Sequence, residues 1–237
     1  MRTCEAVIFD LDNTLAESAW LWRESIAECV GAHGAEVTGQ EHREWICPAE
    51  DAPAVGAKLG VAADYVRRWC TGYAAERAHL VNLLPGADDM VSDCADLVPV
   101  ALCTSSSLPF VDAFSSRYPA LAARFPVIVT GDDVTRRKPD PAAYLLAASR
   151  LGVRPENAIA VEDSTTGITA AAAAGLTVIA IPNSAKPAAP HALTAADHVC
   201  ADASHATRVI RGLIGRKVPQ ARPAITTLAV PMATRGQ

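Results

Sequence analysis

Short apolar runs alternate with longer amphipathic segments over most of the chain. The runs contain few polar side chains, which is typical of strands buried on both faces of a parallel sheet. Segments with helical periodicity separate most of the runs, most clearly at 88–97, 141–151 and 165–174. This alternation predicts an α/β fold with a doubly wound parallel sheet. The predicted strands are 6–9, 98–103, 127–129, 158–161 and 178–181.

The alternation is interrupted directly after the first predicted strand. Helical patterns occupy 20–32, 40–46, 52–59 and 63–80, and no convincing strand pattern lies among them. We therefore expect a small helical domain at 17–83, inserted into a core made of 1–16 and 84–215. The segment 216–237 is rich in Pro, Thr and Ala without periodicity, and we predict a flexible tail there.

Composition narrows the classes of protein that fit. The net charge is −5 without a long basic run, which argues against a nucleic-acid surface. The seven cysteines form no CxxC pair, so we expect reduced thiols in a cytoplasmic protein rather than disulfides or a zinc ribbon. We expect no signal peptide, because the apolar run at 6–9 is too short and two aspartates follow it. We expect no membrane helix, because no apolar stretch approaches the roughly 20 residues that such a helix needs. Either a monomer or a homodimer fits these properties.

Two carboxylates follow the first predicted strand, in Asp10-Leu11-Asp12-Asn13-Thr14. Open α/β sheets bind ligands at the carboxyl ends of their strands. One carboxylate there can attack phosphorus, while the other exchanges a proton with the leaving oxygen and with water. A polar turn after a strand is the structural alternative.

Three further strand ends carry polar groups. Thr104 and Ser105 begin a hydroxyl cluster that can hold phosphate oxygens or cap a helix. Lys138 can neutralise the charge of phosphoryl transfer, or belong to a solvated basic helix entry. Glu162 and Asp163 suit a hard cation, or mark a capped helix start. Because strand ends converge on one edge of a parallel sheet, the four groups together predict one site.

In order and spacing these motifs resemble the haloacid dehalogenase superfamily, specifically subfamily I with a helical C1 cap, whose members are phosphatase-like or β-phosphoglucomutase-like. The resemblance covers about 6–181 and implies a Rossmann-like core, a helical cap at the insert, Mg²⁺ and a covalent aspartyl-phosphate. The matching residues are Asp10-Leu11-Asp12-Asn13-Thr14, Thr104, Lys138 and Glu162-Asp163-Ser164-Thr165-Thr166-Gly167.

The resemblance also implies a role for each core residue. Asp10 would be the nucleophile and Asp12 the general acid and base. Thr104 and Lys138 would bind the transferring phosphoryl group. The ligands of Mg²⁺ would be Asp10, the backbone carbonyl of Asp12 and Asp163, with Glu162 close by.

Rival chemistries of the superfamily differ at single positions. Haloacid dehalogenases lack the second aspartate, so Asp12 argues against dehalogenation. β-Phosphoglucomutases carry a histidine early in the first cap helix, where Trp22 stands here. Without such a cap group to couple Asp12 to sugar binding, we expect Asp12 to act on water. We therefore expect a phosphatase that hydrolyses a small phosphorylated metabolite, such as a sugar phosphate or a phosphoglycolate-like ester. The alternatives are a sugar-phosphate mutase and a non-catalytic phosphate-binding module.

Substrate choice in this class depends on cap residues, where the sequence is less informative. We expect Ser105, Glu17, Trp22 and Arg43 to bind substrate. Arg43 suits a carboxylate or a second phosphate. A solvated helix face explains Arg43 equally well, and helix packing explains Trp22.

Overall fold

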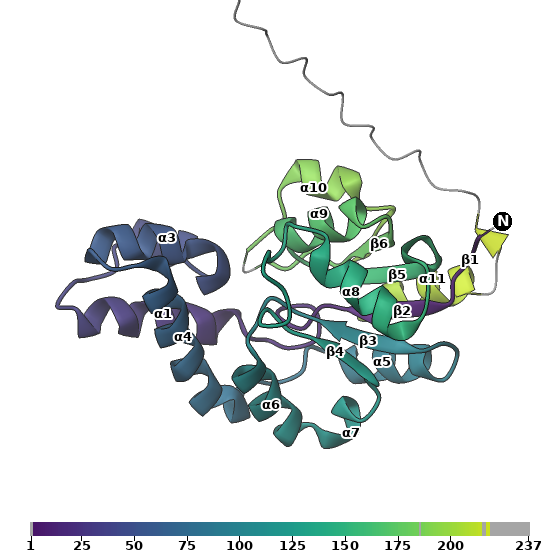
Figure 1. The fold of residues 1–237 in the computed structure, drawn as a ribbon, viewed down its shortest axis with the longest axis horizontal. Coiled ribbons are helices and arrows are strands. Elements are labelled where there is room, and N and C mark those ends of the chain that lie inside the picture. The colour runs from purple at the N-terminus through teal and green to yellow at the C-terminus, as the bar shows by residue number, and fades with distance from the viewer. Residues whose placement is uncertain (1, 185, 215–216, 219–237) are drawn as a thin grey trace, which may run out of the picture.

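The computed structural model describes residues 2–184, 186–214 and 217–218. Within these residues, six strands form one sheet in the order β4-β3-β2-β5-β6-β7, and all neighbouring strands run parallel (Figure 1). The strands are β2 (Ala6–Phe9), β3 (Val100–Cys103), β4 (Val127–Val129), β5 (Ala158–Glu162), β6 (Thr177–Ala180) and β7 (His198–Val199).

Each predicted apolar run overlaps one of these strands, and the sheet confirms the doubly wound α/β fold with a helical cap after the first core strand. The run at 98–103 begins its strand later than predicted, at Val100. Strand β7 was missed because it has two residues, of which Val199 is exposed.

Alternate side chains of the strands face two separate apolar layers. Ala6 and Ile8 of β2 pack with helices α8 (Ala142–Leu151), α9 (Thr165–Ala173) and α10 (Pro190–Ala195). Val7 and Phe9 face the opposite layer, formed with α5 (Ala87–Ala95), α6 (Leu108–Arg117) and α11 (Ala203–Ile214). Burial on both faces explains why the strands show no polar alternation.

The cap consists of α1 (Ala19–Ala32), α2 (Gly39–Glu44), α3 (Pro48–Leu59) and α4 (Ala63–Arg77). It has its own apolar core, in which Ile26, Val55 and Val66 are fully or almost fully buried. The cap lies beside the sheet, at the left of Figure 1. Its two connections to the core run next to each other: Glu17 N donates to Asn82 O at 2.8 Å, and Leu84 N donates to Leu15 O at 2.8 Å.

The remaining elements are short. They are the 3₁₀ helices η1 (Ala78–Leu80) and η2 (Pro155–Asn157), helix α7 (Pro119–Ala122), and the antiparallel pair β1 (Arg2–Thr3) and β8 (Lys217–Val218). The predicted tail at 216–237 lies outside the described residues, except for Lys217–Val218. No helix in the described part of the chain is long and apolar enough to cross a membrane.

Candidate active site

The polar strand ends meet at one edge of the sheet. Asp10 follows β2, Thr104 follows β3, and Glu162 is the last residue of β5. Strand β2 lies between β3 and β5, so these three positions are neighbours. Backbone bonds from Asp10 N to Val161 O (3.0 Å) and from Thr104 N to Val129 O (2.9 Å) continue the sheet into the site.

Lys138 connects three of these strand ends from the loop that follows β4. Its ammonium group donates to Asp10 Oδ1 at 2.7 Å and to Glu162 Oε1 at 2.6 Å. It also donates to the carbonyl oxygen of Cys103 at 2.9 Å. Tyr144 of α8 donates to the same Glu162 oxygen at 2.7 Å. The lysine is buried, so these contacts fix the position of its charge beside Asp10.

The electrostatics of this group reflect burial and close charges. Burial alone lowers the pKa of Lys138, but Asp10 and Glu162 hold that pKa well above its ordinary value. Burial raises the pKa of Asp10 to about 8, with Glu162 adding to the rise and Lys138 opposing it. Burial, together with Asp10 and Glu162, raises the pKa of Asp163 well above its ordinary value. Three buried carboxyl groups therefore share one lysine, and Asp10 and Asp163 resist ionisation without a further positive charge beside them.

The chemistry of the acidic group fits a divalent cation. Asp10, Glu162 and Asp163 each offer a carboxylate oxygen, and these oxygens lie within 4.8 Å of one another. Carboxylate oxygens are the ligands that Mg²⁺ prefers. The Glu162 oxygens already accept bonds from Lys138, Tyr144, Ser164 and two backbone N–H groups. Asp10 and Asp163 are therefore the better candidates for direct ligands, and Glu162 orients Lys138.

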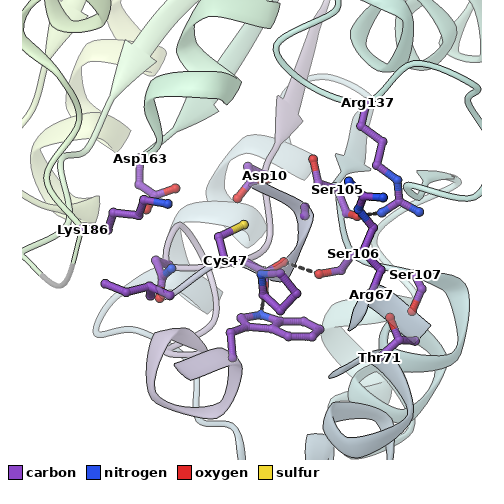
Figure 2. A pocket seen from close by; sticks show the side chains of 16 residues that line it. Asp10, Cys47, Arg67, Thr71, Ser105, Ser106, Ser107, Arg137, Asp163 and Lys186 are labelled. Carbon is purple, nitrogen blue, oxygen red and sulfur yellow. Dashed lines mark hydrogen bonds between the residues drawn. The ribbon is translucent and has the colours of Figure 1, made fainter. Parts of the chain in front are cut away.

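Asp12 points to a different set of partners. Its Oδ1 accepts from Ser18 Oγ at 2.7 Å and from Trp22 Nε1 at 2.6 Å. Its Oδ2 accepts from Thr104 Oγ1 at 3.1 Å and from Ser106 Oγ at 2.6 Å. The bond to Ser106 is visible in Figure 2. The two aspartates of the first motif thus occupy separate environments: Asp10 beside the lysine, and Asp12 among hydroxyl groups and an indole.

A pocket between the core and the cap contains both aspartates (Figure 2). Of the residues predicted to bind substrate, Ser105 and Trp22 line this pocket. Glu17 and Arg43 do not line it, and both are exposed. Arg43 lies on α2, a short helix without a buried residue, so the solvated-face interpretation is the one that its position supports.

The pocket also contains residues that the sequence did not single out. The cap contributes Arg67 and Thr71 from α4, and Cys47 from the start of α3. The core contributes Arg137 and Lys186. Arg137 lies next to Lys138 in a basic run, and that neighbourhood was the one signal that could have identified it.

One carboxylate of the cap contacts the core beside the pocket. Glu50 of α3 accepts from Thr166 Oγ1 of α9 at 2.6 Å and from Lys186 Nζ at 2.6 Å. Thr166 lies three residues after Asp163, so this contact joins the cap to the helix that follows the acidic group.

Comparisons with known proteins agree with this geometry. The family model described as haloacid dehalogenase-like hydrolase matches residues 7–181. Protein CbbY from Cereibacter sphaeroides is 34% identical, over 75% of this chain and 84% of that protein. Hexitol phosphatase A from Escherichia coli (strain K12) is 32% identical, over 75% of this chain and 83% of that protein.

Solved structures have the same architecture. A mutant of CbbY from Rhodobacter sphaeroides, in complex with xylulose-(1,5)bisphosphate, superposes with a TM-score of 0.73 at 29% identity, covering 85% of this chain and 96% of that one. A putative beta-phosphoglucomutase from Thermotoga maritima has a TM-score of 0.68 at 26% identity, covering 88% and 99%. The predicted superfamily and the prediction of an enzyme are therefore confirmed: this chain belongs to the haloacid dehalogenase-like hydrolases.

Proposed function

We propose that the chain is a Mg²⁺-dependent phosphatase that hydrolyses a small phosphate ester through an aspartyl-phosphate on Asp10. The observation that carries this proposal is the placement of Asp10 and Asp12 in one pocket with different partners. Asp10 is held against the Lys138 ammonium group. Asp12 accepts bonds from hydroxyl groups and an indole, and a substrate oxygen can replace one of these donors. Named phosphatases among the relatives, such as hexitol phosphatase A, support the same reaction class.

In the first step, a carboxylate oxygen of Asp10 attacks phosphorus. The bond from phosphorus to the ester oxygen breaks, and Asp12, in its protonated form, gives that oxygen its proton. Lys138 lies 2.7 Å from Asp10 Oδ1, and its positive charge stabilises the negative charge of the transferring group. Alcohol and aspartyl-phosphate are the products of this step.

In the second step, Asp12 removes a proton from a water molecule, which attacks the aspartyl-phosphate and releases inorganic phosphate. The pocket lies between core and cap, so the cap can exclude other water molecules while the intermediate waits. Asp10 returns as a free carboxylate, and Asp12 returns as a protonated acid for the next turnover.

Asp10 and Asp163 would hold Mg²⁺, with Thr14 orienting Asp163 through a bond of 3.3 Å between Thr14 Oγ1 and Asp163 Oδ1. The metal ion would reduce the repulsion between the Asp10 carboxylate and the negatively charged ester. Removing it would leave the buried carboxylates with Lys138 alone as a counter-charge.

The expectation of hydrolysis rests on Trp22, which stands where mutases carry a histidine that couples Asp12 to sugar binding. Trp22 of α1 donates a bond to Asp12, so the cap side chain that contacts the proposed acid and base is an indole and not an imidazole. The named phosphatases among the relatives also support hydrolysis. The mutase alternative predicts formation of glucose 6-phosphate from β-glucose 1-phosphate, primed with the 1,6-bisphosphate, faster than release of inorganic phosphate.

The test is release of inorganic phosphate by purified protein from a panel of phosphate esters. We expect turnover with Mg²⁺, loss of turnover in chelator, and recovery when Mg²⁺ is restored. Asp10→Asn should abolish turnover while circular dichroism stays unchanged, because an amide cannot form the acyl phosphate. Asp112→Asn, an exposed position on α6, is the matched control and should retain full activity. Turnover by folded Asp10→Asn protein would refute the mechanism.

A further inference from the structure

The pocket has a second polar side, separate from the acidic group. Arg67 of cap helix α4 and Arg137 of the core both line it, together with Ser105 and Ser107. Figure 2 shows these residues grouped on one side of the pocket, whereas Asp163 lies on the other. The two arginines come from different domains, so they meet only where the cap lies over the core.

Both guanidinium groups are held in place by bonds to the protein. Arg67 NH1 donates to Asp64 Oδ1 at 2.6 Å. Arg137 NH1 donates to the carbonyl oxygen of Ser105 at 2.7 Å, and its NH2 lies 3.3 Å from Asp132 Oδ1. Gly131 allows this approach, because a Cβ atom there would overlap both Ser105 O and the Arg137 guanidinium. The arginines are therefore oriented before any ligand arrives.

Two buried polar atoms on this side have no hydrogen-bond partner in the structure, namely Arg67 Nε and Ser107 Oγ. Ser107 is only 7% exposed and stands at the N-cap of α6, yet its hydroxyl makes no capping bond. Native structures rarely leave buried polar atoms unpaired without a ligand, a water molecule or a functional reason. A donor from the cap and a hydroxyl from the core thus both lack a partner beside the same pocket.

The local charge favours an anion as that partner. Helix α6 begins at Leu108, and the start of a helix carries the positive end of its dipole. Each arginine is paired with an aspartate, Arg67 with Asp64 and Arg137 with Asp132, and neither aspartate lines the pocket. A guanidinium has five N–H groups, and each pair uses only some of them, so the others can donate to an anion.

We propose that Arg67, Arg137 and Ser107 form a subsite for a second anionic group on the substrate, either a carboxylate or a second phosphate. This proposal deepens the proposed function and rests on it. The phosphoryl group that reacts occupies the side with Asp10 and Lys138. The anion at the opposite side selects esters that carry two charged ends, so the physiological substrate is a small phosphate ester with a second negative group.

The experiment compares esters that differ only in the second anion. Phosphoglycolate and ethyl phosphate form the carboxylate pair. Propane-1,3-diol bisphosphate and propyl phosphate form the phosphate pair, with the rate corrected for two equivalent esters. We expect kcat/KM to be about tenfold or more higher for the doubly charged member of at least one pair, because charge-assisted bonds to arginine are strong. The pair with the larger ratio identifies which anion the subsite prefers.

Three variants assign that preference to residues. Arg67→Met and Arg137→Met should each reduce the ratio within the preferred pair toward one. Arg68→Met is the matched control, because Arg68 is the exposed neighbour on α4 and lines no part of the pocket, and it should keep the wild-type ratio. Ratios near one in the wild type, or equal losses on both members of a pair in the arginine variants, would overturn the subsite.

The proposal can fail independently of the phosphatase function. If the wild type with Mg²⁺ releases phosphate from no ester at all, the proposed function fails. Calorimetric titration with phosphoglycolate and with ethyl phosphate then tests the subsite by binding alone. Tighter binding of phosphoglycolate that is lost in Arg67→Met supports it, and equal affinities overturn it.

Discussion

The indole Nε1 of Trp22 donates a hydrogen bond of 2.6 Å to Oδ1 of Asp12, so a side chain of the cap holds the proposed general acid and base. Trp22 itself packs against Phe110 of α6, with ring centroids 4.8 Å apart. The orientation of Asp12 therefore depends on how the first cap helix lies against the core.

Trp22→Phe should slow the steps in which Asp12 transfers a proton, by roughly one to two orders of magnitude, as expected for loss of positioned acid–base catalysis. Aryl phosphates have good leaving groups and need no acid in the first step, so aspartyl-phosphate should accumulate as a burst with p-nitrophenyl phosphate. An alkyl phosphate should show no burst. Rapid-quench kinetics measure this difference. Trp20→Phe, on the same helix and partly exposed, is the control. Equal losses on both ester types without a burst would indicate a purely structural role.

Gly167 should tolerate no side chain. A Cβ at this position would overlap the Glu162 carboxylate, which is completely buried and bonded to Lys138. Gly167→Ala should lower the free energy of unfolding by about 1–3 kcal/mol through overpacking. It should also reduce kcat strongly, because Glu162 must move away from Lys138.

Gly72→Ala provides the comparison for this variant. Gly72 lies within helix α4, and nothing lies within 4 Å of a Cβ atom there. Alanine should stabilise that helix by about 0.5–1 kcal/mol. Urea unfolding and steady-state kinetics of both variants test the pair. Wild-type activity in Gly167→Ala would show that the Glu162–Lys138 contact is dispensable.

Mg²⁺ should stabilise the folded protein. Binding to the native state alone contributes about 2.7 kcal/mol at a concentration 100 times the Kd. We expect a higher Tm with Mg²⁺, reversed by chelator, and no such shift in Asp163→Asn. Without metal, Asp163→Asn should not be less stable than the wild type, because burial, Asp10 and Glu162 raise the pKa of Asp163 and favour its uncharged form, which asparagine matches in charge and shape. A full metal-dependent shift in this variant would exclude Asp163 as a ligand.

Asp133 should make stability depend on pH in acid. A bond from the backbone of Thr130 lowers the pKa of Asp133 below its ordinary value of 3.8, and Arg150 adds to the effect. Because the pKa is lowered in the folded state, this stabilisation is complete above pH 3.8 and disappears as the pH falls through the folded value. Asp133→Asn should therefore lower the free energy of unfolding by roughly 1 kcal/mol at pH 7, a value kept small because water screens this partly exposed carboxylate. Urea unfolding at pH 7 and pH 3.5 should show a smaller difference at the lower pH.

The core of the site could be predicted because it depends on local pattern. Buried strands of a parallel sheet must be apolar, and their carboxyl ends lie at the same edge of the sheet. The apolar runs therefore predicted the positions of the polar residues that follow them, Asp10, Thr104 and Glu162. Tyr144 was not predicted, because its hydroxyl lies on an otherwise apolar face of α8 and its polar partners come from other elements.

The cap side of the pocket was not predictable in the same way. Arg43 and Arg67 both lie on helices with mixed polar faces, and the sequence does not show which face meets the core. The packing of the cap decides this: Arg67 reaches the pocket, and Arg43 remains exposed. Trp22 lines the pocket as expected, but its indole N–H donates a bond to Asp12. Helical periodicity alone does not reveal that contact.

The neighbouring connections of the cap have a consequence for how this protein can be changed. Ala16 and Leu83 form a bridge, and Leu15 and Leu84 share a backbone bond, so the two chain connections between cap and core lie side by side. A different helical segment whose ends lie equally close can replace 17–83 without cutting a strand of the sheet. Asp10, Lys138 and Asp163 would stay in place in such a chimaera, whereas Trp22 and Arg67 would be exchanged. The acidic group and Lys138 are thus encoded in the core, whereas the cap supplies Trp22 and Arg67, so an exchanged cap would change substrate choice through Arg67 and the orientation of Asp12 through Trp22.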